Sequence, residues 1–485
     1  MKRAVIIYIV LLTLFGMLVY LTLEWGRHPL QSSLSGAAPA AVSLASSNLS
    51  VDSPSIWSAL GKNIETPLSR LLLQFIVILA ATRTLGAFFR RFGQPAVIGE
   101  MAAGILLGPS LLGWLWPDGF SFIFPKDSLG NLQLFSQIGV CLFMFVVGME
   151  FELSHLRQKA RTALVVSHAS IIFPFFLGVV MALSLYTNYA GPRGSFVGFA
   201  LFMGIALSLT AFPVLVRILE ERGIAKTFLG SMAISCAAVG DCTAWAMLAC
   251  VVAIVRATGV AATLLNLGLV VLFLTLMLWV VRPRLPAWIG VDRLKGGNPD
   301  RSVLAVMLIF MTASALATET IGIHALFGAF LAGVVMPRKK EFLEYTVVGL
   351  ENFSRLFLLP LFFAFSGLRT QVDLLSDVSS WMVCLAIIGV AMVGKLGGTT
   401  VSAQLMGLKW NDAFALGALM NTRGLVELVA LNIGYDLGIL SPTIFAMLVL
   451  MALVTTFLTS PLLSLAEYLQ HRTVPAIAVS EQQSL

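Results

Sequence analysis

Apolar runs, each about as long as a membrane helix, follow one another along almost the whole 485-residue chain. A membrane-spanning helix needs about 20 mostly apolar residues, and windows of this size predict a first span at residues 4–23. The core spans are predicted at residues 67–89, 95–114, 131–151, 163–186, 196–217, 227–254, 259–281, 302–318, 322–337, 353–369, 380–404, 411–433 and 441–466. The pattern predicts an all-α polytopic membrane protein with thirteen core helices and one extra N-terminal helix.

The composition supports lipid as the main solvent of this chain. Charged residues make up 11% and hydrophobic residues 58%, whereas an ordinary soluble domain carries about 25% charged residues. The net charge of +7 does not indicate nucleic-acid binding, because cytoplasmic loops of membrane proteins are rich in Lys and Arg. The five cysteines lie inside apolar runs without metal-type or disulfide-type spacing, so no metal site or cofactor is expected.

The charges in the loops predict the orientation. If the loop after residues 67–89 is cytoplasmic, most Lys and Arg residues fall on the cytoplasmic side. The other side receives Arg27, Lys62, Arg70, Lys126, Arg193, Arg256 and Arg369. This asymmetry follows the positive-inside rule and predicts an odd number of core helices in the inner (plasma) membrane.

Three regions are expected. Residues 1–60 combine a basic start, an apolar run and a Ser/Ala/Gly-rich stretch, which is typical of a signal anchor with an external linker; a cleaved signal peptide is the alternative. Residues 61–466 form the transmembrane domain, and residues 467–485 a short cytoplasmic tail.

Charged residues in the middle of apolar spans are the candidate functional residues. Such a charge costs roughly 2.5–3.5 kcal/mol on the insertion scale, so it marks function by default. Asp241 follows Gly240 in the sixth core span, with no charge three or four residues away. It needs a partner, a proton or a cation, and Lys395 in the eleventh span is a possible partner. A carboxylate that binds either a proton or a cation is a minimal exchanger.

Arg423 and Glu427 lie four residues apart in the twelfth span. This spacing lets them pair on one helix face. The pair has either a structural or gating role or a direct role with the ion.

Two spans contain polar residues and helix breakers that predict broken helices. The segment SLTAFP places Ser208, Thr210 and Pro213 inside the fifth span, and MNTRG places Asn421 and Thr422 inside the twelfth. Unwound backbone is tolerated at membrane depth only where it lines a cavity or a site. Because the two segments lie seven spans apart, they fit inverted five-helix repeats with one discontinuous helix each. The simpler interpretation is a proline kink in the first segment and a polar helix end in the second.

Three further polar residues carry weaker signals. Glu100 lies near the predicted cytoplasmic start of the second span, where it is either a gate residue or an interfacial charge. His168 and His324 are lone histidines without ligand spacing.

Several motifs resemble those of monovalent cation:proton antiporters. GQPAVIGEMAAGILLGPSLLG (residues 93–113) resembles the family's second-helix signature, and LTAFPVLVRILEE (209–221) its crossing helix. Residues 327–333, 359–370 and 421–434 are similar to the plant-type cation/proton exchangers. Together the matches span roughly residues 67–466.

The resemblance implies a thirteen-helix antiporter fold with inverted five-helix repeats and two crossing broken helices, assembled as a homodimer. It implies that Asp241 is the ion-binding aspartate, that residues 208–210 are the unwound segment beside it, and that Lys395 is the basic residue on the opposing helix. It also implies a secondary transporter rather than an enzyme, with monovalent cations, protons and the lipid bilayer as partners.

One departure from the family pattern concerns Gly240. The family usually has Asp or Asn before the aspartate, and some potassium-efflux relatives have Gln. A two-carboxylate site is therefore absent, which leaves stoichiometry and the choice between K⁺ and Na⁺ open. The alternatives to antiport are a potassium-efflux system gated by ligand or pH, and a non-transporting membrane sensor with the same fold.

Overall fold

The computed structural model describes residues 16–17, 20–21, 66–150, 160–256, 260–289, 301–322, 324–337, 350 and 352–473. The predicted N-terminal helix lies outside these ranges except for four of its residues, and so do the external linker and the chain after residue 473.

The described part of the chain consists of helices and their connections. Its first half contains α3 (Pro67–Arg91), α4 (Ala96–Leu107), α5 (Leu112–Leu115), α6 (Pro117–Ile123), η1 (Lys126–Ser128), α7 (Leu129–Glu150), α8 (Ala160–Tyr189), α9 (Phe196–Ser208), α10 (Phe212–Glu221) and α11 (Phe228–Arg256).

The second half begins with α12 (Val260–Thr275), η3 (Leu276–Val281), α13 (Arg282–Ile289), α14 (Arg301–Ile321), α15 (Ala325–Val334), η5 (Ser354–Leu358) and α17 (Leu359–Leu368). It continues with η6 (Val372–Leu374), α18 (Val378–Met392), η7 (Val393–Gly397), α19 (Gly398–Leu405), α20 (Trp410–Met420), α21 (Leu425–Asp436) and α22 (Pro442–Thr473). Each of the predicted core spans coincides with one of these helices or with consecutive ones.

The helices have the length and surface of a membrane protein. In the described ranges, nine helical segments are long and apolar enough to cross a bilayer, and α9 and α15 are shorter apolar helices. Large apolar side chains point outward; Trp279, for example, is 80% exposed. Exposed apolar surface of this extent is stable against lipid tails and unstable in water.

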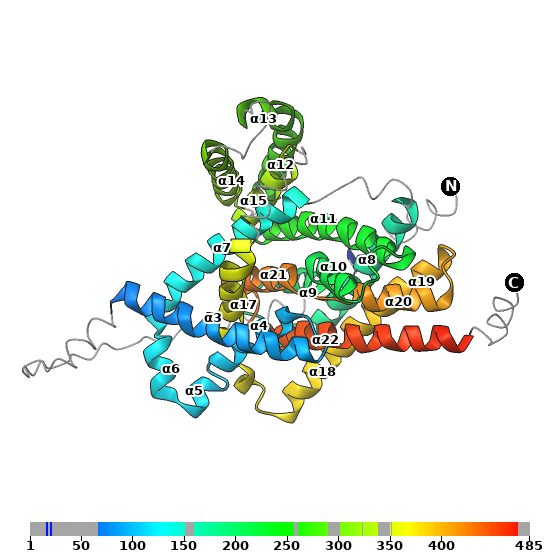
Figure 1. The fold of residues 1–485 in the computed structure, drawn as a ribbon, viewed down its shortest axis with the longest axis horizontal. Helices are drawn as coiled ribbons and strands as arrows, with labels where there is room; N and C mark the ends of the chain where they lie inside the picture. Colours follow the sequence, from blue (N-terminus) through cyan, green and yellow to red (C-terminus); the bar gives the residue numbers. More distant parts are fainter. Residues whose placement is uncertain are drawn as a thin grey trace, which may run out of the picture.

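Two groups of helices surround the centre of the molecule. On one side α4 packs against α3 and α17, and α15 packs against α7 and α14. On the other side α8 packs against α9 and α11, and α20 packs against α19 and α22 (Figure 1). The broken pairs α9–α10 and α20–α21 meet near the middle. They correspond to the fifth and twelfth predicted core spans, with six spans between them, so they run through the membrane in opposite directions.

Candidate functional site

The first broken helix contributes one half of the candidate site. α9 ends at Ser208, Leu209 is extended (φ −66°, ψ 148°), and α10 begins at Phe212. The last carbonyls of one helix and the first amides of the next have no partner inside their own helix. The break therefore presents main-chain oxygens from α9 and main-chain amides from α10, and it lies where the sequence predicted it.

The second broken helix crosses the first at this point. α20 ends at Met420 and α21 begins at Leu425. The Ala211 amide donates a hydrogen bond to the main-chain oxygen of Thr422 (N···O 2.9 Å). The Thr210 hydroxyl donates to the main-chain oxygen of Met420 (Oγ1···O 3.0 Å). The two unwound segments are thus hydrogen-bonded directly to each other in the protein interior.

Gly424 permits this close crossing. A Cβ atom at Gly424 would lie 2.8 Å from the Cγ2 atom of Val214 on α10 and 3.2 Å from the Cβ atom of Ala211. A larger residue would push the two broken helices apart, so the glycine follows from the geometry of the crossing.

Two buried basic side chains cover the carbonyl end of α9. The Lys395 ammonium donates to the main-chain oxygen of Ser208. The Arg423 guanidinium donates to the main-chain oxygens of Ala206 and, through Nη2, Leu207 (2.7 Å). The C-terminal end of a helix carries partial negative charge, so both cations stabilise a helix end that is buried in the membrane.

Lys395 also contacts α8, at a main-chain oxygen that a proline leaves without a donor. Its Nζ donates to the main-chain oxygen of Ser170 at 3.1 Å. Pro174 lies inside α8, four residues after Ser170, and has no N–H to donate to that oxygen. Lys395 itself lies on η7, a π-helical turn, and such turns are frequent at functional sites.

Asp241 lies beside this group, in the middle of α11 and only 4% exposed. The Phe212 amide, at the start of α10, hydrogen-bonds to its carboxylate, and Lys395 attracts the carboxylate electrostatically. Its Oδ1 atom is buried and has no hydrogen-bond partner. The structure thus brings Asp241, Ser208, Thr210 and Lys395 to one place, with one carboxylate oxygen available for a ligand.

The predicted pair of Arg423 and Glu427 forms, although not on one helix face. Arg423 lies in the break between α20 and α21, and its Nη1 is 3.2 Å from the Glu427 Oε1. Both side chains are buried. The Thr456 hydroxyl accepts from the Arg423 amide (2.9 Å) and donates to the Arg423 main-chain oxygen (3.0 Å). The pair therefore belongs to the framework that holds the break.

The remaining polar residues of the second break donate hydrogen bonds to main-chain oxygens of α20 and α22. The Thr422 hydroxyl donates to the main-chain oxygen of Leu419 (2.7 Å), and the Asn421 Nδ2 donates to that of Thr455 on α22 (3.5 Å). The Asn421 Oδ1 is buried without a partner. Asn421 and Thr422 thus stabilise the unwound segment.

Glu100 and the two histidines lie at separate places. Glu100 is half-buried on α4, the helix that packs against α3 and α17. His168 on α8 contacts α11, where its Nε2 is 3.4 Å from the Thr243 Oγ1, two residues beyond Asp241. His324 precedes α15 with φ 151°, a strained conformation for a residue with a side chain.

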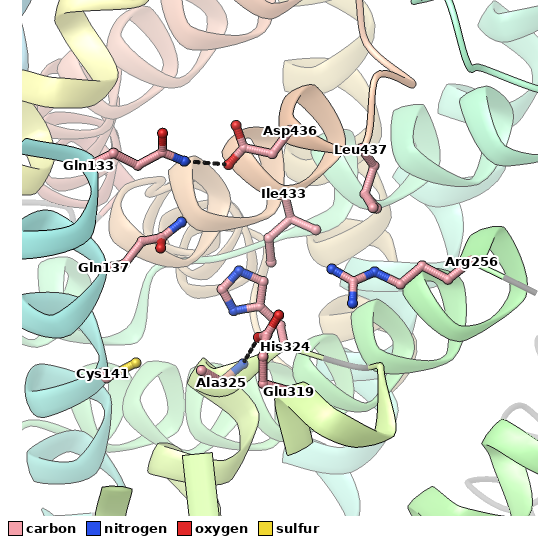
Figure 2. Close-up of a pocket in the computed structure, with 10 residues that line it drawn as sticks. All are labelled: Gln133, Gln137, Cys141, Arg256, Glu319, His324, Ala325, Ile433, Asp436 and Leu437. Carbon is pink, nitrogen blue, oxygen red and sulfur yellow. Dashed lines mark hydrogen bonds between the residues drawn. The ribbon is translucent and has the colours of Figure 1, made fainter. Parts of the chain in front are cut away.

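His324 lines a polar cavity of about 510 Å³ at one end of the helices (Figure 2). The cavity lies between α7, the end of α11, the α14–α15 connection and the end of α21. Glu319 accepts from the Ala325 amide (Oε2···N 2.8 Å), and Gln133 donates to Asp436 (Nε2···Oδ2 3.4 Å). The positive-inside rule predicts that this cavity opens on the external face.

A short polar cluster joins the two groups of helices beside this cavity. Arg369, which follows α17, forms an ion pair with Asp436 on α21 (Nη2···Oδ1 2.7 Å). It also donates to the Asn432 Oδ1 (3.0 Å), and Asn432 donates to the Ser366 hydroxyl (2.8 Å). We call Arg369, Asp436, Asn432 and Ser366 the external latch.

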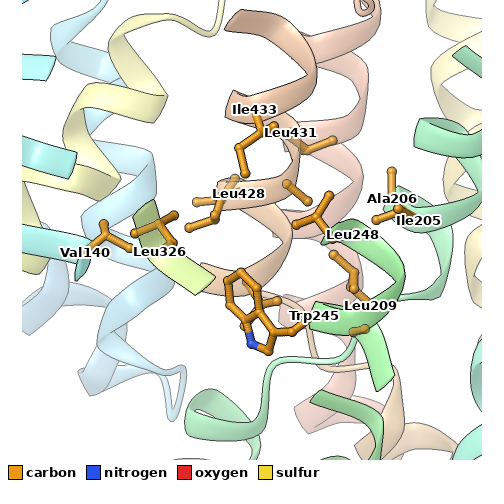
Figure 3. Packing of buried hydrophobic residues seen from close by; sticks show 14 of the residues in the cluster. Val140, Ile205, Ala206, Leu209, Trp245, Leu248, Leu326, Leu428, Leu431 and Ile433 are labelled. Carbon is orange, nitrogen blue, oxygen red and sulfur yellow. The ribbon is translucent and has the colours of Figure 1, made fainter. Parts of the chain in front are cut away.

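An apolar layer lies between the cavity and the crossing of the broken helices (Figure 3). It runs from Ile433, which lines the cavity, to Leu209 in the first break and Trp245 one helical turn beyond Asp241. The Trp245 ring packs edge-on against Phe327 and stacks on Phe330, with centroids 5.3 and 6.1 Å apart. This layer closes the candidate site toward the cavity.

Sequence reasoning missed the contribution of α8. Ser170 and Pro174 were not identified as candidates, and the contact of His168 with Thr243 was not foreseen. Pro174 was the available signal, because a proline inside an apolar span frees a carbonyl just as Pro213 does. Among the described residues no group of three His, Cys, Asp or Glu side chains could hold a metal ion.

Comparison with known families gives one match over most of the chain. The family model described as "Sodium/hydrogen exchanger, transmembrane" matches residues 75–465.

Individual proteins give consistent matches. The Na⁺/H⁺ antiporter NhaS4 of Synechocystis is 41% identical over 393 residues, which cover 81% of this chain and 96% of that protein. Cation/H⁺ antiporter 20 of Arabidopsis thaliana is 40% identical over 410 residues, 81% of this chain and 48% of that protein. The chain therefore spans about half the length of this plant relative.

A solved structure has a similar fold. The sodium proton antiporter MjNhaP1 from Methanocaldococcus jannaschii superposes with a TM-score of 0.58, covering 82% of this chain and 99% of that one at 13% identity. At this identity the similarity concerns the fold.

Proposed function

This chain belongs to the sodium/hydrogen exchanger family, and on that premise we propose that it exchanges Na⁺ or K⁺ for H⁺ by alternating access, with Asp241 as the exchanging group. The family match also confirms the resemblance drawn from the motifs. The cation named for the cyanobacterial relative is Na⁺, whereas the plant relative is named for cations in general, so both ions are candidates.

The observation that carries the proposal is the environment of the Asp241 carboxylate. It is buried, it accepts from the amide at the start of α10, and one oxygen is without a partner. A buried charge is stable only when paired or coordinated. A proton or a small cation bound to Oδ1 satisfies this requirement, and both cannot bind at once.

Ser208 and Thr210 are proposed as further ligands of the cation. The Ser208 hydroxyl donates its hydrogen to the main-chain oxygen of Ile205, and the Thr210 hydroxyl to that of Met420, so the lone pairs of both hydroxyl oxygens remain available as acceptors. Alkali cations are held by oxygen atoms that replace their hydration shell. The hydrogen bonds therefore orient both oxygens as acceptors for a cation.

Lys395 and Arg423 act as fixed positive charges in this scheme. They stabilise the carbonyl end of α9, and Lys395 attracts the Asp241 carboxylate when no cation is bound. An arriving cation competes with this attraction, as does a proton. Arg423, Glu427, Asn421 and Thr422 support the break, and Glu100 on α4 has a gating role in the proposal.

Alternating access requires the site to open to each side in turn. The apolar layer closes it toward the external cavity, so the described conformation separates Asp241 from that cavity. Movement of one helix group against the other would separate Trp245 from the rings of α15. The external latch would have to open in the same movement.

The deciding experiment compares the wild type with Asp241→Asn in proteoliposomes. Asn is nearly isosteric but binds neither a proton nor a cation as a carboxylate does, so exchange should disappear while the melting temperature is kept or raised. Dequenching of a pH-sensitive dye after addition of Na⁺, K⁺ or Li⁺ measures exchange. Near-normal exchange by folded Asp241→Asn would place the ion site elsewhere, and K⁺ flux without H⁺ movement in the wild type would favour a gated efflux system.

We also propose a homodimer in the inner (plasma) membrane. The resemblance to dimeric antiporters and the orientation drawn from loop charges support these two points. Mass measurement of the detergent-solubilised protein and membrane fractionation test them.

A further inference from the structure

The contact between α8 and α11 has an unusual feature next to Asp241. Gly240 has no side chain, and a Cβ atom there would lie 3.2 Å from the Ser167 Oγ. The Ser167 hydroxyl, from α8, thus occupies the space into which a side chain at position 240 would extend. A different helix supplies the polar group at this point.

Two hydroxyls of α8 are buried there without partners. Ser167 and Ser170 lie three residues apart, on neighbouring positions of one helix face, and both have no exposed surface. Neither Oγ atom has a hydrogen-bond partner, and the same is true of the Asp241 Oδ1. Buried polar groups are almost always satisfied, so orphan oxygens on two helices that pack together indicate a site for a ligand.

The same turn of α8 is fixed to the break in α9. The Lys395 Nζ donates both to the Ser170 main-chain oxygen (3.1 Å) and to that of Ser208. One ammonium therefore joins this turn of α8 to the carbonyl end of the first broken helix. This contact fixes the turn of α8 that carries both hydroxyls against the break beside Asp241.

We propose that Ser167 and Ser170 complete the oxygen shell of the transported cation at Asp241, and that Ser167 provides the ligand that Gly240 lacks. The inference rests on the proposed antiport at Asp241 and deepens it. A dehydrated Na⁺ or K⁺ ion needs several oxygen ligands, and one carboxylate oxygen with two hydroxyls supplies part of such a shell. Ser167 then influences cation affinity and the preference between ions.

The test uses Ser167→Ala and Ser170→Ala in the full-length protein, with Ser136→Ala as the matched control. Ser136 on α7 is also buried, with an unpartnered hydroxyl, but lies on the other helix group. Loss of one cation ligand should raise the apparent KM for the cation about tenfold, the change expected for about 1.4 kcal/mol. The kcat should change less than twofold, because Asp241 still binds the proton.

Binding of the cation is measured independently by thermal stabilisation. The wild type and Ser136→Ala should gain melting temperature on addition of Na⁺ or K⁺. Ser167→Ala should gain less at the same concentration, while its melting temperature without cation stays equal or rises. A structural role alone would lower the melting temperature without cation and leave KM unchanged.

A second variant tests the relation between Ser167 and Gly240. The double variant Ser167→Ala/Gly240→Asn places an amide oxygen in the vacated space, and it should recover most of the lost cation affinity. Gly240→Asn alone should bind the cation less well than the double variant, because its Cβ would lie 3.2 Å from the Ser167 hydroxyl, which would have to shift by a few tenths of an ångström.

The outcomes separate the two proposals. Exchange that depends on Asp241 but shows the same KM in Ser167→Ala, Ser170→Ala and Ser136→Ala overturns the α8 shell and leaves antiport intact. Absence of exchange in the wild type with every alkali cation overturns the antiport proposal, and the shell with it.

Discussion

The Lys395 ammonium donates a hydrogen bond to the main-chain oxygen of Ser170, at a distance of 3.1 Å. Pro174 leaves that oxygen without an amide partner inside α8. The carbonyl that a proline leaves unpaired in one helix therefore accepts from a buried lysine on another. Because the same ammonium reaches Ser208, this contact connects the framework of the protein with its candidate ion site.

Replacing the lysine tests this connection. Lys395→Met keeps most of the volume but leaves two buried carbonyls without a donor. Each unsatisfied group costs about 1–3 kcal/mol, so the melting temperature should fall clearly. Exchange should slow as well, because Asp241 loses its electrostatic partner. Thermal unfolding in detergent and the liposome assay measure the two effects.

The double variant Lys395→Met/Pro174→Ala serves as the control. Alanine restores an amide that can donate to the Ser170 oxygen, so Pro174→Ala should stabilise the methionine variant more than the wild type. This non-additivity is expected only for residues that share a partner. Equal effects in both backgrounds would show that Pro174 and Lys395 act independently.

The helices and both breaks could be predicted from the sequence because their signals are local. Runs of about 20 apolar residues identify spans, and Pro213 and Gly424 lie directly at the breaks. Asp241 stood out because a carboxylate in an apolar run requires a reason. None of these inferences needs knowledge of which helices touch.

The partners of these residues could not be predicted because they depend on contacts between distant spans. Lys395 was expected to face Asp241, and the structure adds two carbonyls, from α8 and α9, that no local pattern specifies. Arg423 was placed on a helix with Glu427, but the break leaves it free to reach back to α9. The role proposed for Ser167 could be inferred only from the contact between α8 and α11, where its hydroxyl lies against Gly240.

Arg423 and Glu427 should differ in their effects, although they form one ion pair. Removing one member of a buried pair costs about 3–5 kcal/mol. Arg423→Met also uncovers the oxygens of Ala206 and Leu207, so it should destabilise more than Glu427→Gln, which keeps a hydrogen-bond acceptor for the guanidinium. Thermal unfolding of both variants measures the difference.

The same two variants decide between a structural role and a role with the ion. If the pair is structural, Glu427→Gln should exchange cations with a KM close to that of the wild type. A large rise in KM for folded Glu427→Gln would instead assign the carboxylate to the ion path. Asp241→Asn provides the comparison for a direct ligand.

The external latch should limit the rate of conformational change. Arg369 joins α17 to Asp436 on α21, and these two side chains are 19% and 31% exposed, so the pair contributes only about 1 kcal/mol or less. Arg369→Gln should therefore leave the fold intact and change kcat severalfold. The reversed pair Arg369→Asp/Asp436→Arg should restore much of the wild-type rate. If Arg369→Gln and the reversed pair both exchange at the wild-type rate, the latch has no role in transport.

We predict a stoichiometry of one proton per monovalent cation from the carboxylates at the crossing. Gly240 provides none, and Glu427 is engaged with Arg423, so Asp241 is left to exchange one proton for one monovalent cation. Such exchange moves no net charge, and an imposed membrane potential should leave its rate unchanged. In proteoliposomes with known ion gradients, the net flux should vanish when the cation and proton gradients are equal, at any potential.

A balance point that shifts with potential and fits two protons per cation would contradict this prediction. Lys395 would then be the group to test as a second proton carrier, because Lys395→Met should return the exchange to one proton per cation.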